Sequence, residues 1–233
     1  MDGLSARLSA IDAQIADAAR LAGRAPGEIT RIVVTKFHPA SLVRDLYALG
    51  VRDVGENRQQ ELSAKHAELA AELVELRWHF IGQAQTNKAG AIRRSADAVH
   101  SVDRARIADS LHRAAEDRAT EDIQTLDVLL QVNLTEDTGR GGVAPGEAGR
   151  LAEHILTLPS LRLRGVMGVA PLDERPASAF ERLRAVADGI RAIEPRAHWI
   201  SAGMTGDFVE AIAAGATHLR IGSAITGPRP DRG

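Results

Sequence analysis

Eight short strand-like runs alternate with helical segments along the chain, and no other feature of the sequence restricts the fold as strongly. Strands that alternate with helices form βαβ units and a parallel sheet. Eight such units in 233 residues predict an α/β protein, a single (β/α)8 barrel of the TIM type. An open sheet is less favoured, because no G-x-G-x-x-G follows any strand candidate. The strand candidates are residues 31–35, 51–55, 78–82, 98–102, 127–133, 163–169, 198–202 and 218–222.

Helices fit between nearly all of these runs. They are expected at 40–49, 58–76 and 104–118, while Pro145 is placed to open a further helix and Gly215 to close one. Residues 1–24 are expected to form an amphipathic N-terminal helix, because four apolar residues recur at helical spacing: Leu4, Leu8, Ile11 and Ile15. The whole chain, 1–233, is expected to be one barrel domain. Its Gly-rich loop 135–146 and its tail 227–233 are expected to be flexible.

Composition excludes several kinds of site and partner. The sequence has no cysteine, which rules out disulfides, zinc–thiolate sites and a cysteine nucleophile. A net charge of −2 provides no basic field for nucleic acid, and no apolar run is long enough to cross a membrane. The first residues lack a signal-peptide pattern, so a cytoplasmic location is expected.

The eight histidines show no metal-binding spacing, and no metal site is expected. Four of them fall in strand candidates and are expected to be structural: His79, His100, His198 and His218.

Active sites of such barrels lie where strands end and loops begin, and Lys36 stands at the end of the first strand candidate. Only three of the 29 basic residues are lysines, so a lysine at this position draws interest. An amine in a partly dry pocket has a lowered pKa and attacks carbonyl groups, which arginine cannot do. From position alone, the alternative is a surface lysine whose amine extends into solvent or pairs with Glu56.

The segments after the last two strand candidates have the pattern of a phosphate site. Residues 201–206 offer two hydroxyls and two glycines before a helix that Asp207 could cap, and Gly222 with Ser223 adds a second flexible turn. Barrels often bind phosphate with these two loops. The competing interpretation is ordinary turn chemistry.

Many short motifs, in the right order from about Ile32 to Gly227, resemble those of the pyridoxal phosphate homeostasis proteins. These are single-domain barrels related to the N-terminal domain of alanine racemase. The motifs are Thr35-Lys36 with Pro39, Gly55-Glu56-Asn57, Trp78 to Gly82, Gln85 to Lys88, His100 to Asp103, Gln131 to Asn133, Gly141 to Val143, Leu163 to Met167, Ser201 to Asp207, and Arg220 to Gly222.

The resemblance implies a binding site for pyridoxal 5'-phosphate (PLP), with Lys36 as the Schiff-base lysine. It implies that Asn57 lies beside the cofactor, that Met167 lines its pocket and that Arg220 lies near the pyridine nitrogen. The residues implied to hold the phosphate are Ser201, Thr205, Gly206, Gly222 and Ser223. Thr35 and Thr205 stand where serine is common, and Ala84 and Ala202 replace bulkier residues.

The related racemases use a tyrosine from a second domain, and this chain has neither that domain nor a tyrosine besides Tyr47, which falls in the first barrel helix. An arginine at the pyridine nitrogen also keeps that nitrogen unprotonated, which weakens the ring as an electron sink. We therefore expect a PLP carrier for intracellular PLP homeostasis, with no catalytic residue, that releases PLP to PLP-dependent apo-enzymes or to the free pool.

Two enzyme functions remain as alternatives: a racemase-like enzyme with weak activity, and a Schiff-base aldolase acting on a sugar phosphate. Without the racemase dimer contacts, a monomer is expected. Lys65 and Lys88 are weaker candidates for a second PLP site.

Overall fold

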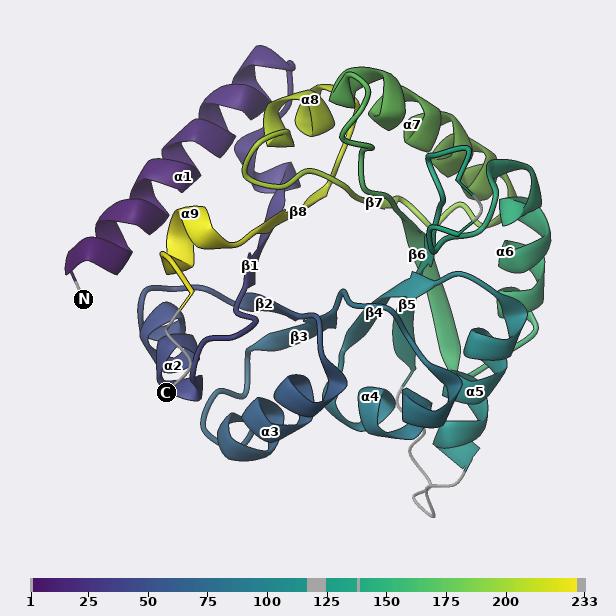
Figure 1. Cartoon of the computed structure of the whole chain (residues 1–233), viewed down its shortest axis with the longest axis horizontal. Coiled ribbons are helices and arrows are strands. Elements are labelled where there is room, and N and C mark those ends of the chain that lie inside the picture. Colours follow the sequence, from purple (N-terminus) through teal and green to yellow (C-terminus); the bar gives the residue numbers. More distant parts are fainter. Residues whose placement is uncertain (1, 117–124, 138, 230–233) are drawn as a thin grey trace.

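The computed structural model describes residues 2–116, 125–137 and 139–229, which form a closed, parallel, eight-stranded barrel (Figure 1). Each strand pairs with the next one along the chain, and β8 pairs with β1 in the register His218–Thr30, which closes the sheet. The predicted (β/α)8 barrel is therefore confirmed. The strands are β1 (Thr30–Val34), β2 (Asp53–Glu56), β3 (Arg77–Phe80), β4 (Ala98–Val102), β5 (Leu126–Gln131), β6 (Leu161–Met167), β7 (Trp199–Ser201) and β8 (His218–Ile221).

Helices surround the barrel on its outside (Figure 1). Pro145 opens the short 3-10 helix η3 (Pro145–Glu147) in front of α6, as predicted, and Gly215 follows α8 with a φ of +97°. The remaining 3-10 helices are η1 (Pro26–Glu28) and η2 (Thr86–Lys88). The α-helices are α1 (Asp2–Leu21), α2 (Ala40–Ala48), α3 (Gln59–Leu69), α4 (Ala89–Ser95), α5 (Ala105–Glu116), α6 (Ala148–Leu156), α7 (Pro176–Ile193), α8 (Phe208–Ala213) and α9 (Ser223–Thr226).

Helix α3 is shorter than the predicted segment 58–76, because the chain leaves the helix after Leu69. Turns then bury Leu73 and Leu76 and return the chain to the barrel, where the N–H of Arg77 donates to the carbonyl of Arg52. Helix α5 was expected over 104–118, and residues 117 and 118 lie outside the described part, as do 230–233 of the expected tail.

The N-terminal helix α1 covers the barrel beside α8 and α9 (Figure 1). Its four periodic apolar residues are buried, as the spacing predicts: Leu4, Leu8, Ile11 and Ile15. The Nε of Arg7 also donates to the carbonyl of Ile225 in α9 at 2.7 Å. Because α9 lies against β1 and the cavity described below, α1 supports one wall of that cavity from outside.

The inside of the barrel is polar at positions where Val, Ile and Leu are usual. A hydrogen bond joins His100 of β4 to Ser201 of β7, and because these strands are not neighbours in the sheet, it passes through the interior. The buried polar residues involved are His79, His100, Ser201 and Arg220, with His218 close by. Such groups remain buried only when they are hydrogen-bonded.

His198 differs from its prediction. It precedes β7 instead of lying in it, and its exposed ring bonds through Nδ1 to the carbonyl of Arg196 at 2.8 Å.

Candidate functional site

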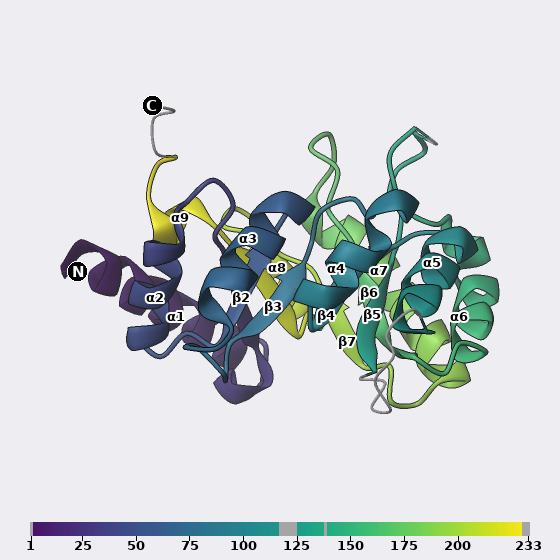
Figure 2. The same cartoon turned by 90° about the horizontal axis from the view of Figure 1, so that it is seen from below.

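A cavity of about 410 Å³ opens where the strands end, between the segments that follow β1, β7 and β8. In Figure 2 the loops that follow the strands lie on the upper side of the barrel, together with α9. The cavity joins residues from the two ends of the chain. Six residues predicted from the sequence line it: Lys36, Thr205, Gly206, Arg220, Gly222 and Ser223.

Lys36 directly follows β1 and stands half-buried in the cavity wall. The alternative prediction, that Lys36 pairs with Glu56, is wrong, because a different lysine forms the ion pair with that carboxylate. The Nζ of Lys65 lies 2.6 Å from Oε1 of Glu56. Among the described residues, Lys36 forms no ion pair. Its amine is therefore available to a carbonyl group in the cavity.

The amine of Lys65 is already hydrogen-bonded to other groups of the protein. It is buried in α3, and its Nζ donates both to Glu56 and to the carbonyl of Thr35 at 2.8 Å. The hydroxyl of Thr35 also donates to Oε1 of Glu56, at 2.6 Å. This cluster lies directly behind Lys36 in the chain and fixes the end of β1. It gives no support to Lys65 as a second PLP site, and Lys88 lies in η2 outside the cavity lining.

Arg220 is a buried cation without an acidic partner. Its Nη1 donates to Oγ of Ser201 at 2.7 Å and its Nη2 to the carbonyl of Gly168 at 2.9 Å. No carboxylate of the described residues forms an ion pair with it. Burial lowers the pKa of Arg220 to about 10, so it still carries its charge at neutral pH. Two of its five N–H groups are used, and its side chain borders the cavity.

The loops after β7 and β8 present unpaired backbone donors. The N–H groups of Thr205 and Gly206 have no acceptor among the described residues, and no atom lies within 4 Å of the place where Gly206 would carry a Cβ. Ser223 begins α9, whose first N–H groups have no partner inside the helix. Together with the hydroxyls of Thr205 and Ser223, these donors suit an anion such as a phosphate.

Asp207 stands at the N-cap position of α8 but does not cap the helix with its side chain. Its Oδ1 instead accepts the N–H of Met204 at 2.6 Å, and its own N–H donates to the Met204 carbonyl at 3.2 Å. The capping prediction was therefore wrong. The carboxylate closes the turn 204–207 on itself and so holds the shape of the loop.

Three predicted residues do not line the cavity. Ser201 is fully buried, and its hydroxyl is used by Arg220 and His100, so a contact with the phosphate has no support in this geometry. Met167 packs inside the barrel with Trp199. Asn57 follows β2, and its Oδ1 is buried without any hydrogen-bond partner, as is expected of an acceptor that serves a ligand.

Sequence reasoning missed Phe37, His38 and Arg229, which also line the cavity. Phe37 has a φ of +69°, the left-handed conformation that non-glycine residues rarely adopt. Its N–H donates to Oε2 of Glu61 at 2.8 Å, and the guanidinium of Arg229 lies 3.9 Å from its ring centroid. No sequence pattern marks such a backbone conformation in a phenylalanine.

A chain of hydrogen bonds runs below the cavity through the barrel. Arg220 donates to Ser201, whose Oγ lies 2.9 Å from Nδ1 of His100. Nε2 of His100 lies 2.9 Å from Nδ1 of His79, and Nε2 of His79 lies 2.9 Å from Oδ1 of Asp53. Asp53 begins β2, so the chain ends at the opposite opening of the barrel, where Arg77 also contacts Asp53 at 2.7 Å.

Burial governs the charges in this interior. It lowers the pKa of His100 well below its ordinary value and that of His218 to about 3, so both rings are neutral at pH 7. Burial by itself would raise the pKa of Asp53. The hydrogen bond from His79 and the charge of Arg77 outweigh it, and the pKa of Asp53 falls below its usual range.

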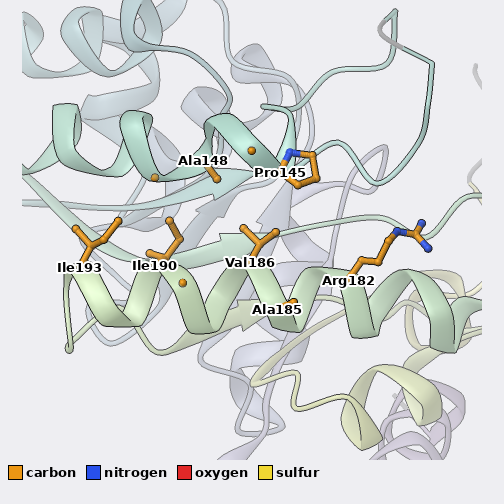
Figure 3. Close-up of a pocket in the computed structure, with 10 residues that line it drawn as sticks. Pro145, Ala148, Arg182, Ala185, Val186, Ile190 and Ile193 are labelled. Carbon is orange, nitrogen blue, oxygen red and sulfur yellow. The ribbon is translucent and has the colours of Figure 1, made fainter.

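A larger hollow of about 600 Å³ lies on the outside of the barrel between α6 and α7. Figure 3 shows Val186, Ile190 and Ile193 of α7 facing Ala148 across it. Its lining is apolar apart from Arg182 and contains no nucleophile or acid. The smaller cavity at the barrel mouth is therefore the candidate functional site.

Within the described residues, no group of three or more His, Asp or Glu side chains is arranged to hold a metal ion. No described helix is both long and apolar enough to cross a membrane.

Comparisons with known proteins agree with this geometry. Residues 7–230 match the family model of the alanine racemase N-terminal domain. The pyridoxal phosphate homeostasis protein of Mycobacterium tuberculosis is 43% identical over 97% of this chain and 93% of its own length. That of Pseudomonas aeruginosa is 40% identical over 98% of this chain and 97% of its own length.

A solved structure, PipY of Synechococcus elongatus with PLP bound, is similar with a TM-score of 0.82. It is 32% identical and covers 96% of this chain and all of its own. Both the sequence and the fold therefore place the chain in one family. It belongs to the pyridoxal phosphate homeostasis proteins, which share the fold of the alanine racemase N-terminal domain.

Proposed function

We propose that the protein binds pyridoxal 5'-phosphate in the mouth cavity and holds it as a Schiff base on Lys36. It thereby serves intracellular PLP homeostasis, as a carrier that passes PLP to PLP-dependent apo-enzymes. The names of its relatives and the PLP found in PipY support this proposal. We further propose a cytoplasmic monomer in which residues 1–233 are one domain.

One observation carries the proposal: a buried arginine and a lysine, neither of which forms an ion pair within the described residues, share one cavity. A desolvated cation is unfavourable unless something accepts its hydrogen bonds. Arg220 has donors left beyond those used by Ser201 and Gly168, and it donates them to the pyridine nitrogen of PLP. An arginine there stays protonated, so the nitrogen it contacts stays an acceptor.

The other parts of the cavity suit the remaining groups of PLP. The loops with Thr205, Gly206 and Ser223 supply free N–H groups and hydroxyls for the phosphate. Gly222 lets the chain turn between β8 and α9 next to them. Asn57 has an unsatisfied buried acceptor directed to no protein group, which suits a polar group of the cofactor. Met167 packs inside the barrel and does not line the cavity, so its expected contact with the cofactor has no support in this geometry.

An absorbance spectrum tests the proposal directly. Purified wild-type protein with added PLP should show a visible Schiff-base band that borohydride removes, and Lys36→Ala should lack it. Lys88→Ala is the matched control, since it removes a lysine outside the cavity and should keep the band. A wild-type protein that stays colourless with PLP would overturn the proposal and favour an aldolase that binds a sugar phosphate.

Weak racemase-like activity is a second candidate because of His38. This residue lines the cavity, and burial, aided by the charge of Lys65, lowers its pKa, so its ring is a neutral base at pH 7. Tyr47 of α2 cannot replace it, since its ring packs against Arg52 and does not line the cavity. Turnover of L-alanine to D-alanine that is lost in His38→Gln would support this function over carriage alone.

A further inference from the structure

The two ends of the hydrogen-bond chain below the cavity are chemically opposite. Arg220 can only donate hydrogen bonds, and the ionised Asp53 can only accept them. Between them stand three groups that can do both: Ser201, His100 and His79. The fixed ends therefore determine where every proton in between must lie.

The direction follows step by step from the arginine. Oγ of Ser201 accepts from Arg220, and because Ser201 is fully buried, the only acceptor for its own proton among the described residues is Nδ1 of His100. Nδ1 of His100 therefore carries no proton, which leaves the ring proton on Nε2. That proton is donated to Nδ1 of His79 at 2.9 Å.

The last step repeats this logic. Nδ1 of His79 accepts, so the ring proton of His79 lies on Nε2 and is donated to Oδ1 of Asp53 at 2.9 Å. In the opposite direction, His100 would donate to Ser201, and the serine proton would have no acceptor among the described residues. An unsatisfied buried hydroxyl is costly, so only the direction from Arg220 to Asp53 satisfies every group.

We propose that Asp53, His79 and His100 are positioning residues that act through Ser201 to hold Arg220 as an oriented donor toward the bound cofactor. This relay rests on the proposed function of the cavity. It extends the cofactor site through the barrel to the opening at the start of β2, where Arg77 lies 2.7 Å from Asp53. Other charged or titratable groups near it are Asp207, whose charge acts on Arg220, His218, whose ring centroid lies 6.4 Å from that of His79, and Arg164, stacked on Trp199.

The first test uses the protein without cofactor. Nitrogen-15 NMR of the histidine rings at pH 7 should show a protonated Nε2 and an unprotonated Nδ1 for both His79 and His100. Assignments come from His79→Gln and His100→Gln. A proton on Nδ1 of either ring would overturn the proposed direction, whatever the protein binds.

The second test places the change far from the cavity. Asp53→Asn removes the anionic end, so that His79 no longer has a charged acceptor for its Nε2 proton. We expect about tenfold weaker PLP binding, since His79 then donates to a neutral acceptor instead of a carboxylate and the chain below Arg220 is oriented less firmly. The visible band of the loaded protein should also move. His79→Gln, which keeps a donor for Asp53 but offers no Nδ1 acceptor to His100, should act in the same direction and serves if Asp53→Asn folds poorly.

Asp127→Asn is the matched control. Asp127 also lies near the start of its strand, pairs with Arg162 and is 13% exposed, against 12% for Asp53, but it takes no part in the relay. The absorbance spectrum of the PLP-bound variant and its affinity for PLP should equal those of the wild type. If Asp53→Asn and His79→Gln behave like Asp127→Asn while the wild type binds PLP, the relay is wrong. Failure of the wild type to bind PLP would instead overturn the proposed function.

Discussion

The ammonium of Lys65 lies 2.6 Å from Oε1 of Glu56, and both side chains are almost fully buried, at 7% and 0% exposure. Lys65 comes from α3 and Glu56 from the end of β2, while the Thr35 hydroxyl and carbonyl at the end of β1 bind the same pair. The pair thus joins one helix to two neighbouring strands directly before Lys36. Burial raises the pKa of Glu56 even though Lys65 opposes this effect.

Breaking this pair from one side should destabilise the protein strongly. Lys65→Met leaves Glu56 buried without a counter-ion, a change that costs about 3–5 kcal/mol in comparable pairs. Chemical denaturation of the cofactor-free protein measures the loss. The double variant Lys65→Met/Glu56→Leu removes both charges and should recover most of the stability. A double variant no more stable than Lys65→Met would contradict this account.

Arg220 should contribute to PLP binding but little to the free energy of unfolding. Its lowered pKa of about 10 means that burial disfavours its charge by about 3 kcal/mol, roughly the worth of the bonds to Ser201 and Gly168. We expect Arg220→Met to unfold within about 1 kcal/mol of the wild type when no cofactor is present, yet to bind PLP at least about tenfold more weakly. Arg164→Met, at the other end of the barrel, should leave PLP binding unchanged. A large loss of stability in cofactor-free Arg220→Met would contradict the argument.

The sequence sufficed for the barrel because each strand and helix carries its own periodic signal. Strand β4 was predicted to the residue, at 98–102, and the cavity position of Lys36 followed from its place at a strand end. Both predictions depend on local pattern and on the rule that strand ends meet at one face.

The sequence did not reveal which side chains from segments far apart in the chain would pair with one another. Whether Glu56 pairs with Lys36 or Lys65 depends on how α3 packs. The hydroxyl oxygen of Ser201 can accept a hydrogen bond from Arg220 because β7 and β8 are adjacent in the barrel. The histidines of β3 and β4 were expected to be structural, but nothing in their spacing indicated a continuous chain to the cavity. The left-handed Phe37 likewise has no sequence signal.

The hydroxyls of Thr205 and Ser223 should matter for the phosphate and not for the ring. Both residues line the cavity, in the two loops that also present unpaired N–H groups within the described part of the chain. Thr205→Val and Ser223→Ala keep the shape of these loops and each should weaken PLP binding about tenfold, since hydrogen bonds to a charged group are lost. Binding of pyridoxal, which lacks the phosphate, should be unchanged. Equal losses for PLP and pyridoxal in a titration by absorbance would show that these loops do not hold the phosphate.

The buried histidines should make stability fall in mild acid. Burial lowers the pKa of His218 from 6.5 to about 3 and lowers that of His100 as well, so the folded protein keeps both rings neutral while the unfolded chain takes up protons below pH 6.5. The stability is therefore complete above pH 6.5 and declines as the pH falls toward 3. For His218 alone, the loss of stability approaches about 4 kcal/mol at the acid end.

Denaturant midpoints measured between pH 4.5 and 7.5 should depend less steeply on pH in His218→Phe, which keeps a ring beside Trp199. His198→Gln alters an exposed histidine and should keep the wild-type slope, and an unchanged slope in His218→Phe would mean that this buried ring does not govern the acid response.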